Sequence, residues 1–195
     1  MNWLCSTLLV CLSFNPEMDY TNNDEFIEDV SACVVHLNSM HDEYERVPVN
    51  LVVAQAIHES TWGRSRFAVE GNNLLGIRTF DSADNQMKPL NKPNVSWGLR
   101  IFETKCESIS YYIELLNNNH HYNEFREERL MQHFSDEIDL EKLAMTLAIY
   151  AEDVYYTQKI IKTLRKLNDK HTNNVLQSQF ITKNYSYISC CFIRR

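Results

Sequence analysis

The sequence predicts a mainly α-helical fold with one small irregular or β lobe. Only four glycines and four prolines occur among 195 residues, so few positions suit the tight turns that β-sandwiches and barrels need. Apolar residues recur at intervals of three and four along several segments, which is the helical period. Three of the four glycines fall within residues 71–98, and this confines the irregular part to one stretch.

Composition and charge indicate one folded domain. The apolar content of 44% and the aromatic content of 11% are enough for a core, which excludes a disordered chain. The net charge is −7, and the longest basic run is the terminal Arg194-Arg195 pair. We therefore expect no nucleic acid partner, because binding to phosphate backbones needs a basic surface.

Residues 1–20 contain an apolar run from Trp3 to Phe14. This run is too short for a transmembrane helix but has the length of the apolar part of a secretory signal. It lacks a basic start and a small-residue cleavage site, so a first core segment of the domain is the alternative. Any membrane association is expected only through this segment.

Residues 21–167 are predicted to form the domain. A first helix begins near Asn22 and Asp24, and its apolar positions are Phe26, Val30, Cys33, Val34, Leu37 and Tyr44. Pro48 suits the first turn of a second helix, which should end near Trp62-Gly63, with Gly63 as a left-handed cap. Glu59 then lies in the last turn.

Further helices are expected after the lobe. Thr104 and Glu107 have the spacing of a capping box at the start of one helix. Another is predicted from about 139 to 150, and a last one carries apolar residues at 156, 160, 164 and 167. Residues 168–195 show no helical period and are treated as a tail.

The cysteines and histidines give no metal or disulfide pattern. The six cysteines form no C-x-x-C pair, and only Cys33 and Cys106 lie in the middle of the chain. We expect most of them to be small buried apolar side chains. The motif at His58-Glu59 begins like H-E-x-x-H, but Trp62 stands at the second histidine position, so no metal or cofactor is expected.

Glu59 is the best candidate for acid–base chemistry. The negative end of the helix dipole and burial against Trp62 would both raise the pKa of its carboxyl group, as a general acid requires. Sugar-binding platforms and amide partners could come from Trp62, Asn72, Asn73, Phe80, Trp97 and Tyr150. The alternatives are an exposed glutamate in a frayed turn, ordinary core aromatics, and asparagines that only form a turn.

The stretch "AQAIHESTWGRSRFAVEGNNLLGI" resembles the signature of the glucosaminidase family, A-Q-A-x-x-E-S-x-W-G-x-S followed by N-N-L. "LRIFETKCESISYYIELL" and "YAEDVYYTQKIIKTL" are similar to later elements of the same family, so the resemblance covers about residues 47–167. Within the family, the motif is most similar to the stand-alone bacterial branch. The resemblance implies a lysozyme-like helical domain with a small lobe beside a substrate groove. It further implies Glu59 as catalytic acid and Tyr150 as the residue that positions substrate or water.

Two departures from the family pattern bear on the mechanism. Thr61 stands where relatives have glycine, and a β-branched residue would be strained there if the backbone needed a positive φ. Many relatives also carry a second acid in the lobe, whereas residues 85–102 contain no carboxylate. Asp81 or Asp84 could act as the base, the N-acetyl group of the substrate could assist, or Tyr150 could position a water.

The predicted function is a peptidoglycan hydrolase, an endo-β-N-acetylglucosaminidase that cleaves the glycan strands of the bacterial cell wall by general-acid catalysis. The alternatives are a catalytically weak glycan-binding module and a lytic transglycosylase of the same fold. The expected partner is the glycan strand, and the expected state is a monomer. Such a substrate places the protein in the periplasm or cell envelope, although the sequence leaves the export route open.

Overall fold

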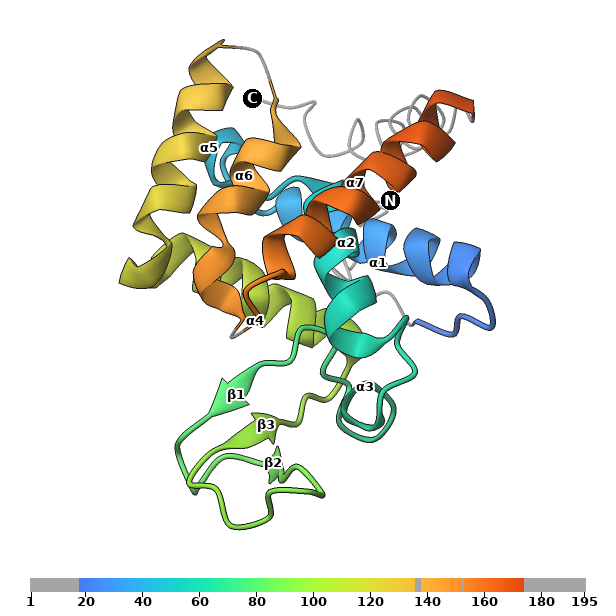
Figure 1. Cartoon of the computed structure of the whole chain (residues 1–195), viewed down its shortest axis with the longest axis vertical. Helices are drawn as coiled ribbons and strands as arrows, with labels where there is room; N and C mark the ends of the chain where they lie inside the picture. The colour runs from blue at the N-terminus through green and yellow to red at the C-terminus, as the bar shows by residue number, and fades with distance from the viewer. Residues whose placement is uncertain (1–17, 136–137, 152, 174–195) are drawn as a thin grey trace, which may run out of the picture.

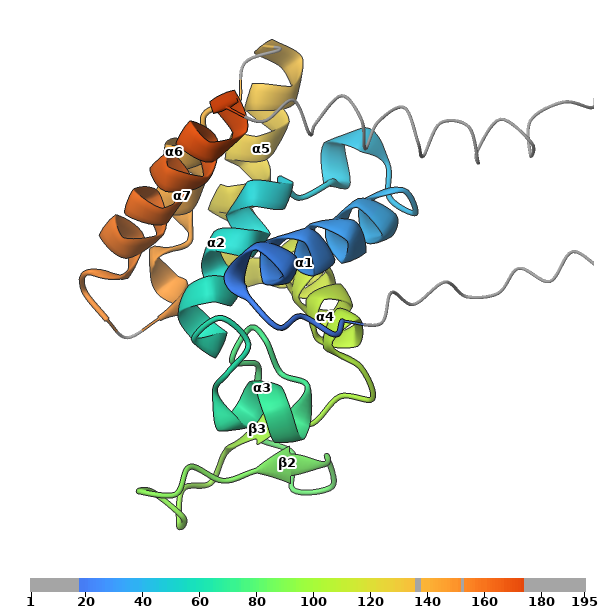
Figure 2. The ribbon, with the colours of Figure 1, turned by 90° about the vertical axis from the view of Figure 1, so that its right-hand side faces the viewer.

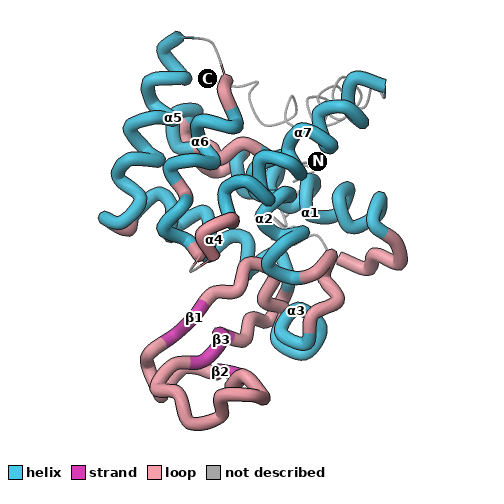
Figure 3. Tube along the Cα trace, viewed as in Figure 1, coloured by secondary structure: helices cyan, strands magenta, loops and turns pink. Residues whose placement is uncertain are grey.

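The computed structural model describes residues 18–135, 138–151 and 153–173, and it shows a helical body with a small sheet at one end (Figure 1; Figure 3). The predicted mainly α fold with a small β lobe is confirmed. The α-helices are α1 (Asn23–Asn38), α2 (Val49–Ser60), α3 (Arg66–Gly71), α4 (Lys105–Asn118), α5 (Asn123–Ser135), α6 (Leu140–Thr146) and α7 (Tyr156–Asn173). Short 3-10 turns are η1 (Glu43–Glu45), η2 (His120–Tyr122) and η3 (Ala148–Tyr150). Among these residues, no helix is long and apolar enough to cross a membrane.

Helix α2 is the centre of the body. Every residue from Leu51 to Ile57 is buried, and α1 and α7 pack against the helix from different sides (Figure 2). A helix that is covered on all sides must be apolar nearly all round, which explains its run of valine, alanine, leucine and isoleucine. Gln55 is the one polar residue in that run.

The lobe is a three-stranded antiparallel sheet of β1 (Arg78–Thr79), β3 (Gly98–Arg100) and β2 (Gln86–Met87), in that spatial order. Arg78 lies opposite Leu99, and Met87 pairs with Leu99 from the other edge. The buried Asn73 amide joins the lobe to the body. Its nitrogen donates to the carbonyls of Ile77 and Arg100, and its oxygen accepts from the Ile77 amide.

Cys33 and Cys106 form a disulfide, so the expectation of unpaired buried thiols is wrong for these two residues. Their sulfurs are 1.97 Å apart, and the bond links α1 to α4. Both side chains are buried, as expected, but the packing of α1 on α4 brings their Cα atoms to 5.8 Å, within bonding range for a disulfide. Residues 5, 11, 190 and 191 lie outside the described residues, as does the apolar run from 3 to 14.

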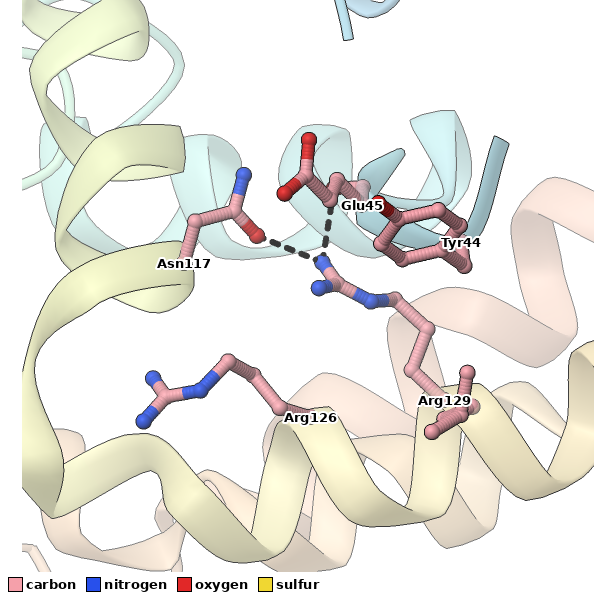
Figure 4. Close-up of a pocket in the computed structure, with 6 residues that line it drawn as sticks. Tyr44, Glu45, Asn117, Arg126 and Arg129 are labelled. Carbon is pink, nitrogen blue, oxygen red and sulfur yellow. Dashed lines mark hydrogen bonds between the residues drawn. The ribbon is translucent and has the colours of Figure 1, made fainter. Parts of the chain in front are cut away.

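Helix α5 was not predicted, because its inner face is polar. Its buried residues are Phe125, Arg129 and Gln132, and only the first is apolar. Arg129 Nη1 donates to the Glu45 carbonyl and to Asn117 Oδ1, each at 2.8 Å (Figure 4). These bonds link α5 to η1 and α4 in addition to the packing of Phe125 in the core.

The structure also corrects two helix boundaries. The predicted first helix ends at Asn38, before Tyr44, which lies in η1 with 47% of its surface exposed. Helix α7 continues to Asn173, beyond the end of its apolar period. Asn168 lies on that extension, where it accepts a hydrogen bond from Asn50. Six residues assigned to the tail are therefore helical.

Candidate active site around Glu59

Helix α2 ends in a sharp left-handed turn. Thr61, Trp62 and Gly63 have φ values of 53°, 60° and 71°, so three consecutive residues adopt a conformation that favours glycine. The predicted left-handed cap is confirmed, but it starts at Thr61 rather than Gly63. Ser60 stabilises the turn, because its hydroxyl donates to the Ala56 carbonyl at 2.5 Å and accepts from the Gly63 amide at 2.7 Å.

The Glu59 carboxyl is partly buried just before this turn. Burial raises its pKa to about 7, against the opposing effects of a hydrogen bond from Tyr156 and the charge of Arg78. The predicted rise is confirmed. The chain passes close to the carboxyl at Gly76, whose φ is +65° and where an added Cβ would lie 3.0 Å from Glu59 Oε2. Glycine is required at this close approach.

Tyrosine rings line the inner side of the site. Tyr150 stacks on Tyr156 at 6.1 Å between ring centroids and meets the edge of Tyr112 at 5.4 Å. The Tyr150 hydroxyl donates to the Leu75 carbonyl. Burial raises the pKa of Tyr150, Tyr112 and Tyr156 above the usual range for tyrosine, and the Glu59 carboxylate raises all three further. These hydroxyls therefore stay protonated at neutral pH.

The candidate aromatic platforms lie in different places. The Arg78 guanidinium lies over the Trp97 ring at 4.3 Å from its centroid, and Arg78 also acts on the Glu59 carboxyl. Phe80 follows β1 in the lobe and is 72% exposed. The Trp62 ring instead packs edge-on to Phe26 of α1 at 6.0 Å. The roles of Trp62, Phe80 and Trp97 in substrate binding stay predictions.

The two asparagines support the lobe from inside. Asn72 Nδ2 donates to the carbonyls of Phe102 and Glu103 at 3.0 and 2.9 Å, and the Asn73 amide is only 1% exposed. All the hydrogen bonds just described join these amides to main-chain groups. Their part in the site is therefore to hold residues 73–77 and 100–103 together, and direct contact of either amide with substrate stays a prediction.

The lobe carboxylates are engaged within the lobe. Asp84 accepts a 2.5 Å hydrogen bond from the Thr79 hydroxyl and pairs with Arg100 at 3.3 Å. Asp81 Oδ1 accepts from the Ala83 amide at 2.9 Å. Within residues 18–135, 138–151 and 153–173, the groups that shift the pKa of Glu59 include no carboxylate. A second acid about 5 Å away, as in retaining glycosidases, would raise that pKa further.

Comparison with known families assigns the chain. The model of the glucosaminidase family, described as mannosyl-glycoprotein endo-β-N-acetylglucosaminidase, matches residues 36–169. The chain belongs to the glucosaminidase family. Glu59, the turn after it, the whole lobe and the tyrosines around the carboxyl all fall within the matched range of this glucosaminidase domain.

Individual relatives agree with that assignment. The exo-glucosaminidase LytG of Bacillus subtilis is 23% identical over 84% of the chain and 58% of its own length. Protein bax of Escherichia coli is 29% identical over 51% of the chain and 35% of its own length. The chain thus spans little more than half the length of LytG and about a third of the length of protein bax. The catalytic domain of the autolysin Auto from Listeria monocytogenes shares the fold, with a TM-score of 0.55 and 20% identity over 77% of the chain and 86% of that domain.

Four site residues of this glucosaminidase domain were missed by sequence reasoning. Gln55, Gly76, Arg78 and Tyr156 each contact or act on the Glu59 carboxyl or its partners. Gln55 lies four residues before Glu59, so the lone polar residue on the same face of an apolar helix was the available signal. The other three come from distant segments, and only the fold brings them to the carboxyl.

Proposed function

We propose that this chain is a peptidoglycan hydrolase of the endo-β-N-acetylglucosaminidase type, with Glu59 as its general acid. The observation that carries the proposal is the pKa of about 7 for a carboxyl group at the junction of body and lobe. Such a group is protonated in a large share of molecules near neutral pH, and it can still lose its proton readily.

In the reaction, Glu59 transfers its proton to the glycosidic oxygen as the bond from that oxygen to the anomeric carbon breaks. Tyr156 then donates a hydrogen bond to the carboxylate that is left, and the positive charge of Arg78 also stabilises it. Water adds to the anomeric carbon and returns a proton to solvent or to Glu59. The net change is hydrolysis, with a new reducing end.

Three groups remain candidates to act together with Glu59. Asp84 is paired with Arg100, so of the two lobe acids Asp81 is the one left as a candidate base. The Tyr150 hydroxyl proton is directed at the Leu75 carbonyl, which leaves the oxygen lone pairs to accept a hydrogen bond from an attacking water. Assistance by the substrate N-acetyl group is the remaining route.

The absence of a carboxylate among the groups acting on Glu59 in the described residues also favours a second candidate, a lytic transglycosylase. That reaction needs one acid, and the muramic acid 6-hydroxyl attacks in place of water. Its product carries an anhydro end instead of a reducing end. The two candidates therefore differ in a measurable product.

The names of the relatives support a proposed substrate and location. One is named an exo-glucosaminidase and another an autolysin, which supports cell-wall glycan as the substrate class. A chain acting on that polymer works in the cell envelope or outside the cell. We propose that it does so as a monomer.

The test is digestion of purified peptidoglycan by the wild type, by Glu59→Gln and by the exposed control variant Glu28→Gln, followed by borohydride reduction and mass spectrometry. We expect N-acetylglucosamine reducing ends from the wild type and from Glu28→Gln. Glu59→Gln should form them about 10²–10⁴ times more slowly, the usual contribution of a general acid.

Each other result has a definite meaning. Anhydro-muramic ends would assign the transglycosylase reaction. Retained glycan binding without any product would identify a binding module instead of an enzyme. Equal rates for Glu59→Gln and the wild type would remove Glu59 from the mechanism.

A further inference from the structure

A line of hydrogen bonds leads from the interior of the body to Glu59. The Tyr112 hydroxyl donates to Gln55 Oε1, and Gln55 Nε2 donates to the Tyr156 hydroxyl at 2.9 Å. The Tyr156 hydroxyl is in turn the side-chain hydrogen-bonding group that lowers the pKa of the Glu59 carboxyl. Tyr112 and Tyr156 come from α4 and α7, which are far from α2 in the sequence, and Gln55 lies on α2 four residues before Glu59.

The direction of each bond follows from the donor before it. Because Gln55 donates to the Tyr156 oxygen, the one proton of the Tyr156 hydroxyl is free to point at Glu59. Because Tyr112 donates to the Gln55 oxygen, the amide nitrogen of Gln55 is turned toward Tyr156. Gln55 is 0% exposed and so is Tyr112, so water does not compete for these positions.

The other groups around the carboxyl do not provide this alignment. Arg78 acts from the lobe as an exposed charge, and Tyr150 directs its proton to the Leu75 carbonyl. The preceding His58 faces away, with Nε2 2.8 Å from the Thr163 hydroxyl. Tyr156 is the group that reaches Glu59 with a hydroxyl donor from the interior.

We propose that Gln55 and Tyr112 are positioning residues that act through Tyr156, which holds the Glu59 carboxyl in its reactive orientation and favours its ionised form. This inference rests on the proposed role of Glu59 as the acid. A hydroxyl that accepts one hydrogen bond is a stronger donor of the next, so each member of the line strengthens the bond at the carboxyl. The line therefore stabilises the carboxylate once its proton has moved to the leaving oxygen.

The test measures the pKa of Glu59 directly, without turnover. Carbon-13 NMR of the side-chain carboxyl, assigned by its loss in Glu59→Gln, is followed from about pH 5 to about pH 9 around the expected midpoint. Tyr156→Phe should raise the midpoint by about one pH unit, because a hydrogen bond to the ionised form is lost. Gln55→Met and Tyr112→Phe keep the Tyr156 hydroxyl beside the Glu59 carboxyl. Gln55→Met should raise the midpoint less than Tyr156→Phe does, and Tyr112→Phe should raise it least.

A double variant decides whether Gln55 acts through Tyr156. If it does, Gln55→Met adds no further rise in the midpoint once Tyr156→Phe is present. Additive rises would show that Gln55 acts independently and would overturn the proposal, as would an unchanged midpoint in Tyr156→Phe. Should Tyr156→Phe fail to fold, a midpoint unchanged in both Gln55→Met and Tyr112→Phe would equally overturn it.

Tyr122→Phe is the matched control. Its ring lies against Tyr150 at 6.5 Å between ring centroids and is buried, with 8% of its surface exposed, but its hydroxyl is not a member of the line. The Glu59 midpoint should not move in this variant, and a rise equal to that of Tyr156→Phe would point to general loosening of the tyrosine cluster. Because the readout is a titration, it stays decisive even if the wild type cleaves no glycan.

Discussion

Glu59 at the end of α2 is a partly buried ionisable side chain and Arg129 in α5 is a buried one, yet only Glu59 has a pKa near neutral pH. Burial raises the pKa of Glu59 to about 7 and lowers the pKa of Arg129 to about 10. The physical cause is the same, since a low-dielectric surrounding disfavours the charged form of either group. The consequences differ because the raised pKa of Glu59 lies near neutral pH, whereas the lowered pKa of Arg129 is still well above it.

The hydrogen-bond partners of Arg129 and Glu59 match this difference in charge state. Arg129 stays charged and donates to a main-chain carbonyl and to Asn117, which fixes α5 against η1 and α4 (Figure 4). A cavity of about 140 Å³ remains beside it, lined by Tyr44, Glu45, Asn117, Arg126, Arg129 and Leu130. Glu59 instead has a hydroxyl partner that stabilises its ionised form without preventing protonation. The permanent charge of Arg129 holds three elements together, whereas the charge of Glu59 can change near neutral pH, as its proposed role as an acid requires.

The largest effect should come from Arg129→Met. Removing the guanidinium leaves the Glu45 carbonyl and Asn117 Oδ1 without their donor, so the free energy of unfolding should fall by about 2–3 kcal/mol. Urea denaturation measures this, and the loss should be equal at about pH 5 and about pH 9, because the Arg129 pKa lies above that range. Turnover per folded molecule should not change. A variant as stable as the wild type would mean that desolvation of the charge outweighs its bonds.

The second prediction concerns the pH dependence that the Glu59 carboxyl gives to the stability of the protein. The folded state holds the proton more tightly than the unfolded chain, so stability is greatest below about pH 4.5 and falls as pH rises to about 7. The rise in pKa from 4.5 to about 7 corresponds to a loss of at most about 3 kcal/mol. Glu59→Gln should lack this loss and so be more stable than the wild type at about pH 8.

The measurement is urea denaturation of both proteins at about pH 4.5 and about pH 8. The free energy of unfolding of the variant should exceed that of the wild type by an amount that grows with pH. Because all other titrating groups are the same in both proteins, this difference reports on Glu59. A difference that is independent of pH would show that the Glu59 carboxyl has an ordinary pKa and would undermine the comparison with Arg129.

A smaller effect is expected at Thr61. Its φ of 53° places a β-branched residue in the left-handed region, and Thr61→Gly should relieve that strain. Because glycine also gains freedom in the unfolded chain, the net stabilisation should be about 0.5–1 kcal/mol. Thermal denaturation can measure it, with the neighbouring exposed Arg64→Gly as a control that should not stabilise. A destabilised Thr61→Gly would show that the threonine side chain makes contacts worth more than the strain.

The smallest effect should follow Arg78→Ala. Its charge lowers the pKa of Glu59, so the variant should move the loss of activity at high pH to slightly higher pH. Arg78 is exposed, and salt should therefore weaken its influence. The pH–rate profiles of wild type and variant should converge in about 1 M salt. Profiles that differ equally at all salt concentrations would assign Arg78 a contact role instead of an electrostatic one.

The sequence by itself determined the local parts of this protein. The end of α2 at an acid, the capping box at Thr104 and Glu107, and the concentration of glycines in the lobe depend on residues within one or two turns of each other. Thr104 accepts from the Glu107 amide, as the spacing predicts, whereas the Glu107 carboxylate accepts from the amide of Glu103, one residue before the cap. Helical period and turn chemistry act over such short ranges, so they can be read in order along the chain.

Tertiary structure alone decided which distant residues meet. The sequence does not show that Cys33 faces Cys106, that a polar face makes α5 a core helix, or that Gln55 reaches Tyr156 across 101 positions. The pKa of Glu59 depends on the same assembly, because burial by several elements is its largest cause. The energy of each of these contacts depends on the distance between the two residues in space. Their separation in the sequence does not give that distance, which is set when the apolar faces of the helices pack together.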